Sequence, residues 1–510
     1  VAMVIFLDIV WYEEREHTNS EHLVLYQGNQ QGERNEERDN LQWTFPIHVG
    51  DDTEEIPHPA LSYFKGRTDT PEDIKESMTV PRFFDSTHAS YYNAPSIREY
   101  LGNGVHLMTP QQASSIGSFI DSPNGPLETF FVSIASYRDP ECSRTIAELY
   151  TWAQHPERIR VAIIDQRLSG DPICGANCDE FPILCQYQHL MDRTEVKATL
   201  SVGPVFARHL AHRHYRGEYF ALQMDAHVRF TDGWDETLVG QWKATRNEMA
   251  VLSTYPLDVD KLDAKTHQPL HKSRAVMCRS DFEGEGPLRH LRHGKQPDRL
   301  GDGTQVLQPF WAAGFSFARG HFLIQVPYDQ HLPMVFQGEE ISIGLRGFTY
   351  GYDYYTPDFG VIFHIYAVRE HKEERRKVHR FWENSIHYQG IGAGAMKRLN
   401  TIIEMEDYPR NEWCTEDEAY YGLGDMRKTK KFFNVFGIHV QEKYVEKDLC
   451  TFVGKPMMKI FKPALRKNRM GIDYDKIDYR FVGSKTEHKL QEEPKKAEPD
   501  GFKRFGLHNQ

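Results

Sequence analysis

The stretch FFVSIASYRDPECSRTIAELYTWAQHPERIRVAIIDQ, residues 130–166, carries the clearest structural pattern in the chain. An apolar run at 130–135 predicts a buried strand, and residues 146–153 then repeat apolar side chains at the spacing of an amphipathic helix. Residues 158–165 have the pattern of a second buried strand. A strand, a helix and a strand in this order predict a parallel sheet covered by helices, so the expected fold class is α/β.

Later segments repeat this alternation. The sequence predicts strands at 218–224, 249–255, 310–317 and 359–366, and helices at 203–216, 234–247 and 339–345. Residues 257–308 are polar with scattered Gly, His and Pro, which predicts a long surface connection. Residues 12–56 are rich in charged and amide side chains and predict a solvated arm, and residues 487–510 predict a polar tail.

The composition restricts the class of protein. The 510 residues include 61 basic and 73 acidic side chains, and the net charge is −12. This balance argues against non-specific nucleic-acid binding, which depends on Lys and Arg neutralising phosphates. No apolar run is long enough to cross a bilayer, although the apolar residues 1–11 leave open a clipped signal anchor.

Seven cysteines are too few for a disulfide scaffold in a chain of this length. The densest group is Cys174, Cys178 and Cys185, and its spacing is not that of a structural zinc site. We therefore expect buried thiols there, with a disulfide in a loop as the alternative. The odd number of cysteines suits a reducing compartment.

The sharpest local signal for chemistry is LQMDAH, residues 222–227, where an apolar strand runs into Asp225 and His227. Residues two apart project to the same side of an extended chain, so both side chains can reach one cation. A carboxylate with an imidazole suits Mn²⁺, and suits Mg²⁺ less well. Asp165 and His364 also follow strands, and ligands collect at such strand ends. The alternatives are a loop Asp, a surface His and a hydrogen-bonded core His.

Two further segments carry candidate binding groups. In FQGEEI, residues 336–341, Glu339 and Glu340 open a predicted helix, where they can hold a sugar hydroxyl or stabilise a developing positive charge. A simple N-terminal helix cap is the alternative. The basic run at 369–380 can bind phosphates or can form a solvated helix face.

Five segments in order resemble one enzyme family: FVSIASYRDPE (131–141), GPVFARHLAHRHYRGEYFALQMDAHVRF (203–230), WAAGFSF (311–317), FQGEEI (336–341) and HIY (364–366). They resemble the cytosolic glycosyltransferases of protists that add N-acetylglucosamine (GlcNAc) to hydroxyproline of a ubiquitin-ligase adaptor. They are similar, more distantly, to the polypeptide N-acetylgalactosaminyltransferases. The resemblance implies a GT-A-type fold, with a mostly parallel sheet flanked by helices. It also implies retaining transfer of GlcNAc, α-linked, from a UDP-sugar to a hydroxyl of hydroxyproline, Ser or Thr.

By this resemblance Asp225, His227 and His364 would hold Mn²⁺, with Mg²⁺ as an alternative, and Glu339 or Glu340 would face the anomeric carbon or the acceptor. The implied nucleotide-sugar site comprises Ser136, Arg138, Asp165, Arg208, Asp225, Gly314, Phe336, Tyr366 and Arg369. Phe336 stands where the galactosaminyltransferases have Trp, and the spacing after His364 departs from their pattern.

We expect an N-terminal extension at 1–127, partly disordered, a catalytic domain at 128–405, an extension packing on or near it at 406–486 and a tail at 487–510. The expected partners are a UDP-sugar and a protein or peptide acceptor, without nucleic acid, and with a membrane only through a clipped anchor. The expected location is the cytoplasm, with the Golgi lumen as alternative. Two other functions stay open: a metal-dependent hydrolase with a zinc-activated water, and a catalytically silent sugar-binding protein.

Overall fold

The computed structural model of the chain describes residues 53–84, 117–446 and 449–477. Within these ranges, none of the helices has the length and apolar character needed to cross a membrane. The apolar residues 1–11, most of the predicted arm and the predicted tail lie outside the described residues.

An eight-stranded sheet forms the centre of the fold, in the order β16-β18-β10-β17-β8-β5-β6-β7. The strands are β5 (Phe130–Tyr137), β6 (Ile159–Arg167), β7 (Met191–Lys197), β8 (Phe220–Asp225), β10 (Ala250–Ser253), β16 (Val306–Gln308), β17 (Phe315–Arg319) and β18 (Asp353–Thr356). β8, β5, β6 and β7 pair in parallel, as does β10 with β18. β17 is antiparallel to both its neighbours. The predicted α/β class with a mostly parallel sheet is confirmed.

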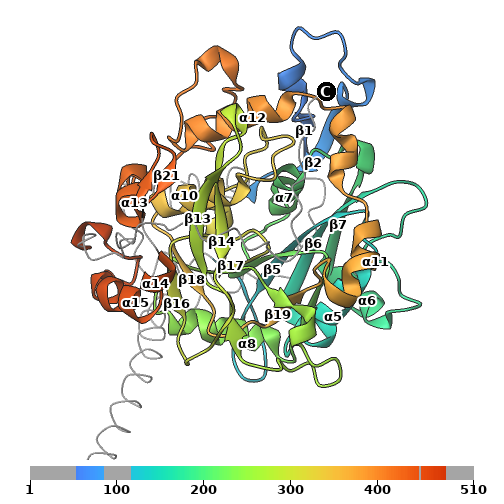
Figure 1. Cartoon of the computed structure of the whole chain (residues 1–510). Helices are drawn as coiled ribbons and strands as arrows, with labels where there is room; N and C mark the ends of the chain where they lie inside the picture. Colours follow the sequence, from blue (N-terminus) through green and yellow to red (C-terminus); the bar gives the residue numbers. More distant parts are fainter. Residues whose placement is uncertain (1–52, 85–116, 447–448, 478–510) are drawn as a thin grey trace, which may run out of the picture. The chain divides into compact units, whose positions relative to one another are not determined.

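Helices alternate with the strands (Figure 1), and the helices at 142–151, 204–212, 234–244 and 339–349 lie where the apolar periodicity predicts them. They are α5 (Cys142–Thr151), α6 (Pro182–Gln186), α7 (Pro204–His212), α8 (Trp234–Ala244), α9 (His321–Gln325), α10 (Glu339–Thr349), α11 (Lys372–Lys377) and α12 (Ile391–Ile402). α7 packs on β5 and β6, and nearly all of its side chains are buried. This helix therefore lies directly beside the strand ends that carry the candidate site.

A second, three-stranded sheet brings two distant segments together at those strand ends. It consists of β11 (Leu257–Asp258), β19 (Ile362–His364) and β9 (Val228–Phe230), with β19 in the middle. β19 pairs antiparallel with β9, so that His364 stands opposite Val228. His364 is thereby placed next to the segment that follows β8.

The prediction of a long surface connection at 257–308 was wrong. The segment forms β12 (Ser273–Arg274), β13 (Met277–Glu283), β14 (His290–Lys295) and β15 (Arg299–Leu300), in addition to β11 and β16. β13 and β14 form a hairpin. Met277, Cys278 and Leu291 are buried, so this polar segment contributes its few apolar side chains to the interior.

The predicted strand at 310–317 forms only in its second half, as β17. Residues 310–314 are a loop that leads into β17. In this loop the backbone N–H of Ala313 donates to the Glu340 carboxylate, 3.0 Å away. The carbonyl of Ala312 accepts a hydrogen bond from the hydroxyl of Ser253. These contacts replace the ladder of a strand and shape the backbone around the candidate site.

The described part of the N-terminal extension packs against the core. β1 (Thr53–Pro57) and β2 (Ser77–Pro81) form a hairpin, and β3 (Phe119–Ile120) pairs with β4 (Leu127–Glu128). Ile56 and Phe64 belong to one hydrophobic cluster with Phe206 of α7. Residues 53–56, predicted as the end of a solvated arm, are therefore ordered strand because one face of the hairpin is apolar.

The C-terminal region continues the fold with α13 (Thr429–Phe436), β20 (Ile438–His439), β21 (Tyr444–Val445), α14 (Leu449–Phe452) and α15 (Lys455–Phe461). α13 contacts α10, α14 contacts β13, and α15 contacts β16. Figure 1 shows these elements at one side of the central sheet.

The cysteine prediction needs correction. Six of the seven cysteines form the disulfides Cys142–Cys174, Cys178–Cys185 and Cys278–Cys450, and Cys414 is free. The expected buried thiols at Cys174, Cys178 and Cys185 were wrong, and the loop disulfide was the correct alternative. The Cys278–Cys450 bond joins β13 to α14 across 172 residues, a pairing that no local spacing reveals.

Candidate active site

Three metal-ligating side chains from two distant segments meet at the carboxyl end of the central sheet. Asp225 ends β8, His227 follows two residues later, and His364 ends β19. Each offers one ligand atom, and these atoms all lie within 4.8 Å of one another. Nε2 of His364 is 3.4 Å from Oδ2 of Asp225, and the two imidazole rings are 4.5 Å apart between centroids.

The chemistry of this donor set fits a divalent cation. One carboxylate with two imidazoles is a set that Mn²⁺ and related ions accept. Nδ1 of His227 is occupied by Asp139, 2.8 Å away, which leaves the opposite ring nitrogen for an ion. Nδ1 of His364 is buried without a hydrogen-bond partner among the described residues, whereas its Nε2 faces Asp225. The candidate metal ligands therefore converge as expected.

Asp139 and Arg375 form an outer layer behind His227. Both guanidinium nitrogens Nη1 and Nη2 of Arg375 donate to the Asp139 carboxylate at 3.1 Å. Burial opposes the charge on Asp139, but His227 and Arg375 outweigh it and hold the pKa of that carboxyl below its usual range. A carboxylate that accepts a hydrogen bond from the ring N–H of a metal-ligating histidine fixes the ring's tautomer and orientation.

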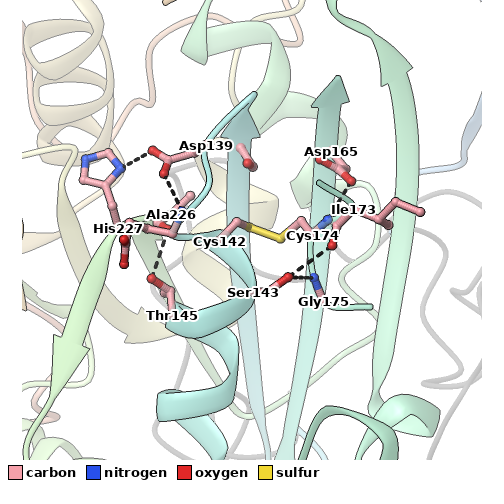
Figure 2. Close-up of a disulfide and its surroundings, with 12 residues drawn as sticks. Asp139, Cys142, Ser143, Thr145, Asp165, Ile173, Cys174, Gly175, Ala226 and His227 are labelled. Atoms are coloured by element: carbon pink, nitrogen blue, oxygen red, sulfur yellow. Dashed lines mark hydrogen bonds and ion pairs between the residues drawn. A yellow bond between two sulfur atoms is a disulfide. The ribbon is translucent and has the colours of Figure 1, made fainter. Parts of the chain in front are cut away.

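The Cys142–Cys174 disulfide stands between the two halves of the site (Figure 2). Cys142 begins α5, just after the loop that carries Asp139. On the other side, the backbone N–H of Cys174 donates to Asp165 at 3.0 Å. The hydroxyl of Ser143 adds a second link, because it donates to the carbonyl of Ile173 at 3.1 Å. The disulfide thus ties the loop after β5 to the loop after β6.

The predicted nucleotide end of the site lies along the same edge. In the sheet register Ala135 stands beside Asp225, and Ser136 beside Asp165. Ser136 is buried, and its hydroxyl has no hydrogen-bond partner among the described residues. Burial raises the pKa of Asp165. Asp165, Ser136 and Asp225 therefore lie near the carboxyl ends of three adjacent parallel strands, where ligands bind in α/β sheets.

Arg208 of α7 links the metal ligands to the first of the two adjacent carboxylates. Its guanidinium donates to Oδ1 of Asp225 at 2.8 Å and also to Oε1 of Glu339. Burial opposes the charge of Arg208, but Glu339 and Asp225 outweigh it and raise the pKa of this side chain. Tyr328 donates to the same oxygen of Glu339 at 2.6 Å. Glu339 is buried and fully engaged inside the protein.

Glu340 has a different environment from Glu339. Its carboxylate is half-buried and accepts from the hydroxyl of Tyr255 at 2.6 Å and from the backbone N–H of Ala313 at 3.0 Å. Burial raises the pKa of Glu340 from its ordinary 4.5 to about 7. Of the two residues, Glu340 is the more exposed.

Two more predicted residues join the cluster. A Cβ atom on Gly314 would lie 3.3 Å from Oδ2 of Asp225, so a side chain here would crowd the candidate metal ligand. The ring of Tyr366 lies 4.1 Å from that of His364, and its hydroxyl donates to the carbonyl of Pro256 at 2.9 Å. Tyr366, two residues after the end of β19, therefore packs against the His364 ring.

The other three predicted binding residues make their contacts away from this cluster. Arg138 donates to Asp171 at 2.7 Å and to Glu383 at 2.8 Å. Arg369 pairs with Asp260, and its side chain is 63% exposed. Phe336 is 48% exposed, and its ring lies 5.5 Å from that of Trp382.

Sequence reasoning missed four residues that position the site: Asp139, Tyr255, Tyr328 and Arg375. Asp139 lies inside the quoted segment at 131–141, yet nothing local shows that it meets His227. Arg375 belongs to the basic run predicted to bind phosphate or face solvent, but it is buried against Asp139.

We predict that Asp139→Asn weakens Mn²⁺ binding by about 10- to 100-fold, because His227 loses the carboxylate that fixes its ring. The change is measured by titrating Mn²⁺ and following the loss of the free-ion paramagnetic resonance signal. Glu373→Gln serves as the control, because Glu373 is an exposed residue whose described ion pair is with Arg376. Equal affinity in Asp139→Asn and the unmodified protein would remove Asp139 from the site.

Comparisons with known proteins place this site in context. A family model described as Glycosyltransferase (GlcNAc) matches residues 129–191 and 182–442. A search of curated protein sequences returned no match. Among solved structures, GalNAc-T7 with UDP, GalNAc and Mn²⁺ is similar at 13% identity and a TM-score of 0.40, over 72% of this chain and 65% of that one. S. aureus TarS 1-349 in complex with UDP-GlcNAc is similar at 11% identity and a TM-score of 0.31, over 57% and 78%.

The match to the family model identifies the family of this chain. It spans more than half of the 510 residues and contains every candidate site residue described above, from Ser136 to Arg375. The chain therefore belongs to the family of GlcNAc glycosyltransferases.

Proposed function

We propose that the protein transfers GlcNAc from UDP-GlcNAc to a hydroxyl of a protein acceptor, hydroxyproline, Ser or Thr, with retention and an α linkage. The observation that carries the proposal is the convergence of Asp225, His227 and His364 beside Glu339 and Glu340. The family membership supports sugar transfer. The resemblance of five ordered segments supports the donor and the acceptor class.

Three residues would bind the metal ion that stabilises the leaving diphosphate, and two others orient these ligands. Asp225, His227 and His364 would hold Mn²⁺, which when bound takes up negative charge on the diphosphate. Arg208 fixes the Asp225 carboxylate, and Asp139 fixes the His227 ring. Both ligands are therefore oriented before the donor binds, which lowers the cost of reorganisation. We assign Ser136 and Asp165, at the ends of the neighbouring strands, to the uridine.

The two carboxylates take different roles. Glu339 accepts from Arg208 and keeps that guanidinium in place. Glu340 is more open and is the better candidate to stabilise the positive charge that grows on the sugar ring as the bond to the diphosphate breaks. With retention, the acceptor hydroxyl attacks the face that the diphosphate leaves.

We predict that Asp225→Asn lowers UDP-GlcNAc turnover at least about 1,000-fold, because it removes a ligand charge where the leaving group builds its own. UDP release is measured across several UDP-sugars, with Mn²⁺ and with EDTA, in the presence and absence of acceptor peptides. Asp171→Asn, which removes the charge paired with Arg138 and keeps a side-chain oxygen for the backbone N–H of Leu168, is the control for general loss of charge nearby.

Three results of this screen would contradict the proposal. Unchanged turnover in Asp225→Asn would reject the metal ligand. Zinc-dependent hydrolysis that needs no acceptor would favour a hydrolase. Binding of UDP-sugars without turnover of any donor would favour a catalytically silent sugar-binding protein.

The pKa of Glu340 gives a pH prediction. If the ionised carboxylate acts, kcat/KM falls as the pH drops through about 7. Tyr255→Phe removes a hydrogen bond that lowers this pKa, so the acidic limb moves to higher pH. The pKa of Glu340 is higher in the folded than in the unfolded chain, so the folded state favours the protonated carboxyl. The stability that this carboxyl contributes is therefore fully present below pH 4.5 and is lost as the pH rises through about 7.

Tyr444→Phe is the matched control, because Tyr444 is exposed. This variant should leave unchanged the acidic limb of kcat/KM and the pH dependence of the free energy of unfolding. An acidic limb that stays at the same pH in Tyr255→Phe would remove Glu340 from the catalytic step.

We also propose that the protein works in an oxidising lumen, which was the alternative to the cytoplasm. Six cysteines lie in three disulfides, and such bonds persist in secretory compartments rather than under cytosolic glutathione. The prediction is one free thiol per denatured, unreduced chain from the native source, counted by mass spectrometry after alkylation. A count of seven free thiols would place the protein in a reducing compartment.

A further inference from the structure

A second cluster of metal-ligating side chains lies outside the proposed donor site. His331, Cys414 and Glu416 each offer one ligand atom, and these atoms all lie within 4.8 Å of one another. His331 is buried, Cys414 is half-buried and Glu416 reaches the surface. Cys414 is also the cysteine that the three disulfides leave over, and its thiol hydrogen-bonds the His331 ring.

We propose that His331, Cys414 and Glu416 form a structural Zn²⁺ site. A thiolate, an imidazole and a carboxylate are the three ligand types that zinc takes in proteins. The soft thiolate disfavours Mg²⁺, Ca²⁺ and Mn²⁺, which prefer oxygen ligands. The donor set of this cluster is therefore distinct from that of Asp225, His227 and His364.

A buried arginine, Arg398, connects the two loops that carry the ligands of the cluster. Nε of Arg398, in α12, donates to Asp329 at 2.7 Å, and its Nη1 donates to the carbonyl of Cys414 at 2.5 Å. Asp329 in turn accepts the backbone N–H of His331 at 2.9 Å. One fully buried guanidinium thus holds the two ligand-bearing loops at a fixed separation.

Asp417 and Lys65 lie next to the cluster, and their contacts are compatible with a bound Zn²⁺. Oδ2 of Asp417 lies 2.9 Å from Nε2 of His331, so this carboxylate is available as a fourth ligand or as an outer partner. Lys65 pairs with Oε1 of Glu416 at 2.9 Å, but both side chains are exposed. Exposed ion pairs contribute little stability, so an ion can displace Lys65 at little cost.

The ion would join two separate segments of the chain, and a third segment contacts the site. The hydroxyl of Tyr63, from the N-terminal region, donates to the carbonyl of His331 at 2.7 Å. His331 lies three residues after Tyr328, the residue that donates to Glu339. A zinc ion at this cluster therefore stabilises the base of the loop that leads to the candidate active site.

Cobalt substitution tests the proposal without any activity measurement. The full chain, produced without a histidine tag, is stripped with EDTA and titrated with Co²⁺. Thiolate ligation gives a charge-transfer absorption band in the near ultraviolet, and Cys414 is the free thiol that can produce it. The variants are Cys414→Ser, His331→Gln and Asp225→Asn, and the neighbouring Glu412→Gln is the matched control.

We expect the band in the unmodified protein, in Asp225→Asn and in Glu412→Gln, and we expect Zn²⁺ to abolish it by competition. Cys414→Ser and His331→Gln should lack the band. Absence of the band in the unmodified protein, or its persistence in His331→Gln, would overturn the site. Because Asp225→Asn keeps the band, failure of the donor-site proposal is distinguished from failure of this one.

A second measurement needs only the unmodified protein and so does not depend on the folding of a variant. Alkylation of Cys414 by iodoacetamide should slow at least about tenfold when Zn²⁺ is added and should recover with EDTA, because a metal-bound thiolate is shielded. An unchanged alkylation rate, or a disulfide-linked dimer through Cys414, would overturn the proposal.

Discussion

The arrangement of the site depends on one buried guanidinium, that of Arg208. Asp225 and Glu339 would repel each other in the protein interior without a positive charge between them. Arg208 donates to both carboxylates and compensates their charge. Removing one partner from such a buried set costs about 3–5 kcal/mol, because an uncompensated charge is left behind. The candidate metal ligand and the carboxylate layer behind it therefore form one electrostatic unit.

Scaffold elements on either side hold this unit in place. α7 carries Arg208 and packs on β5 and β6 through an almost fully buried surface. The Cys142–Cys174 disulfide connects the loop of Asp139 with the loop that contacts Asp165. Rigid support of this kind is what a transferase needs, because its catalytic groups must be oriented before negative charge develops on the leaving group. The difference between Glu339 and Glu340 follows from the same packing, since α10 turns the first inward and leaves the second partly open.

Much of the scaffold was predictable because its signals are local. The apolar run at 130–135 and the helical stripe at 146–153 became β5 and α5. The segment at 257–308 was not predictable in this way, because its strands pair over short stretches and its polar side chains hide the alternation. The Cys278–Cys450 pairing was equally inaccessible, since these two cysteines lie 172 residues apart and meet where α14 packs on β13.

The sequence by itself determined the α/β class and the strand ends that carry Asp165, Asp225 and His364, because apolar periodicity and strand termination are properties of short segments. Only the tertiary structure decided that Asp139 meets His227, that Arg208 lies between two carboxylates, and that His331 meets Cys414. These contacts join residues between 17 and 131 positions apart along the chain. They depend on how whole helices and sheets pack, and no spacing along the chain records that.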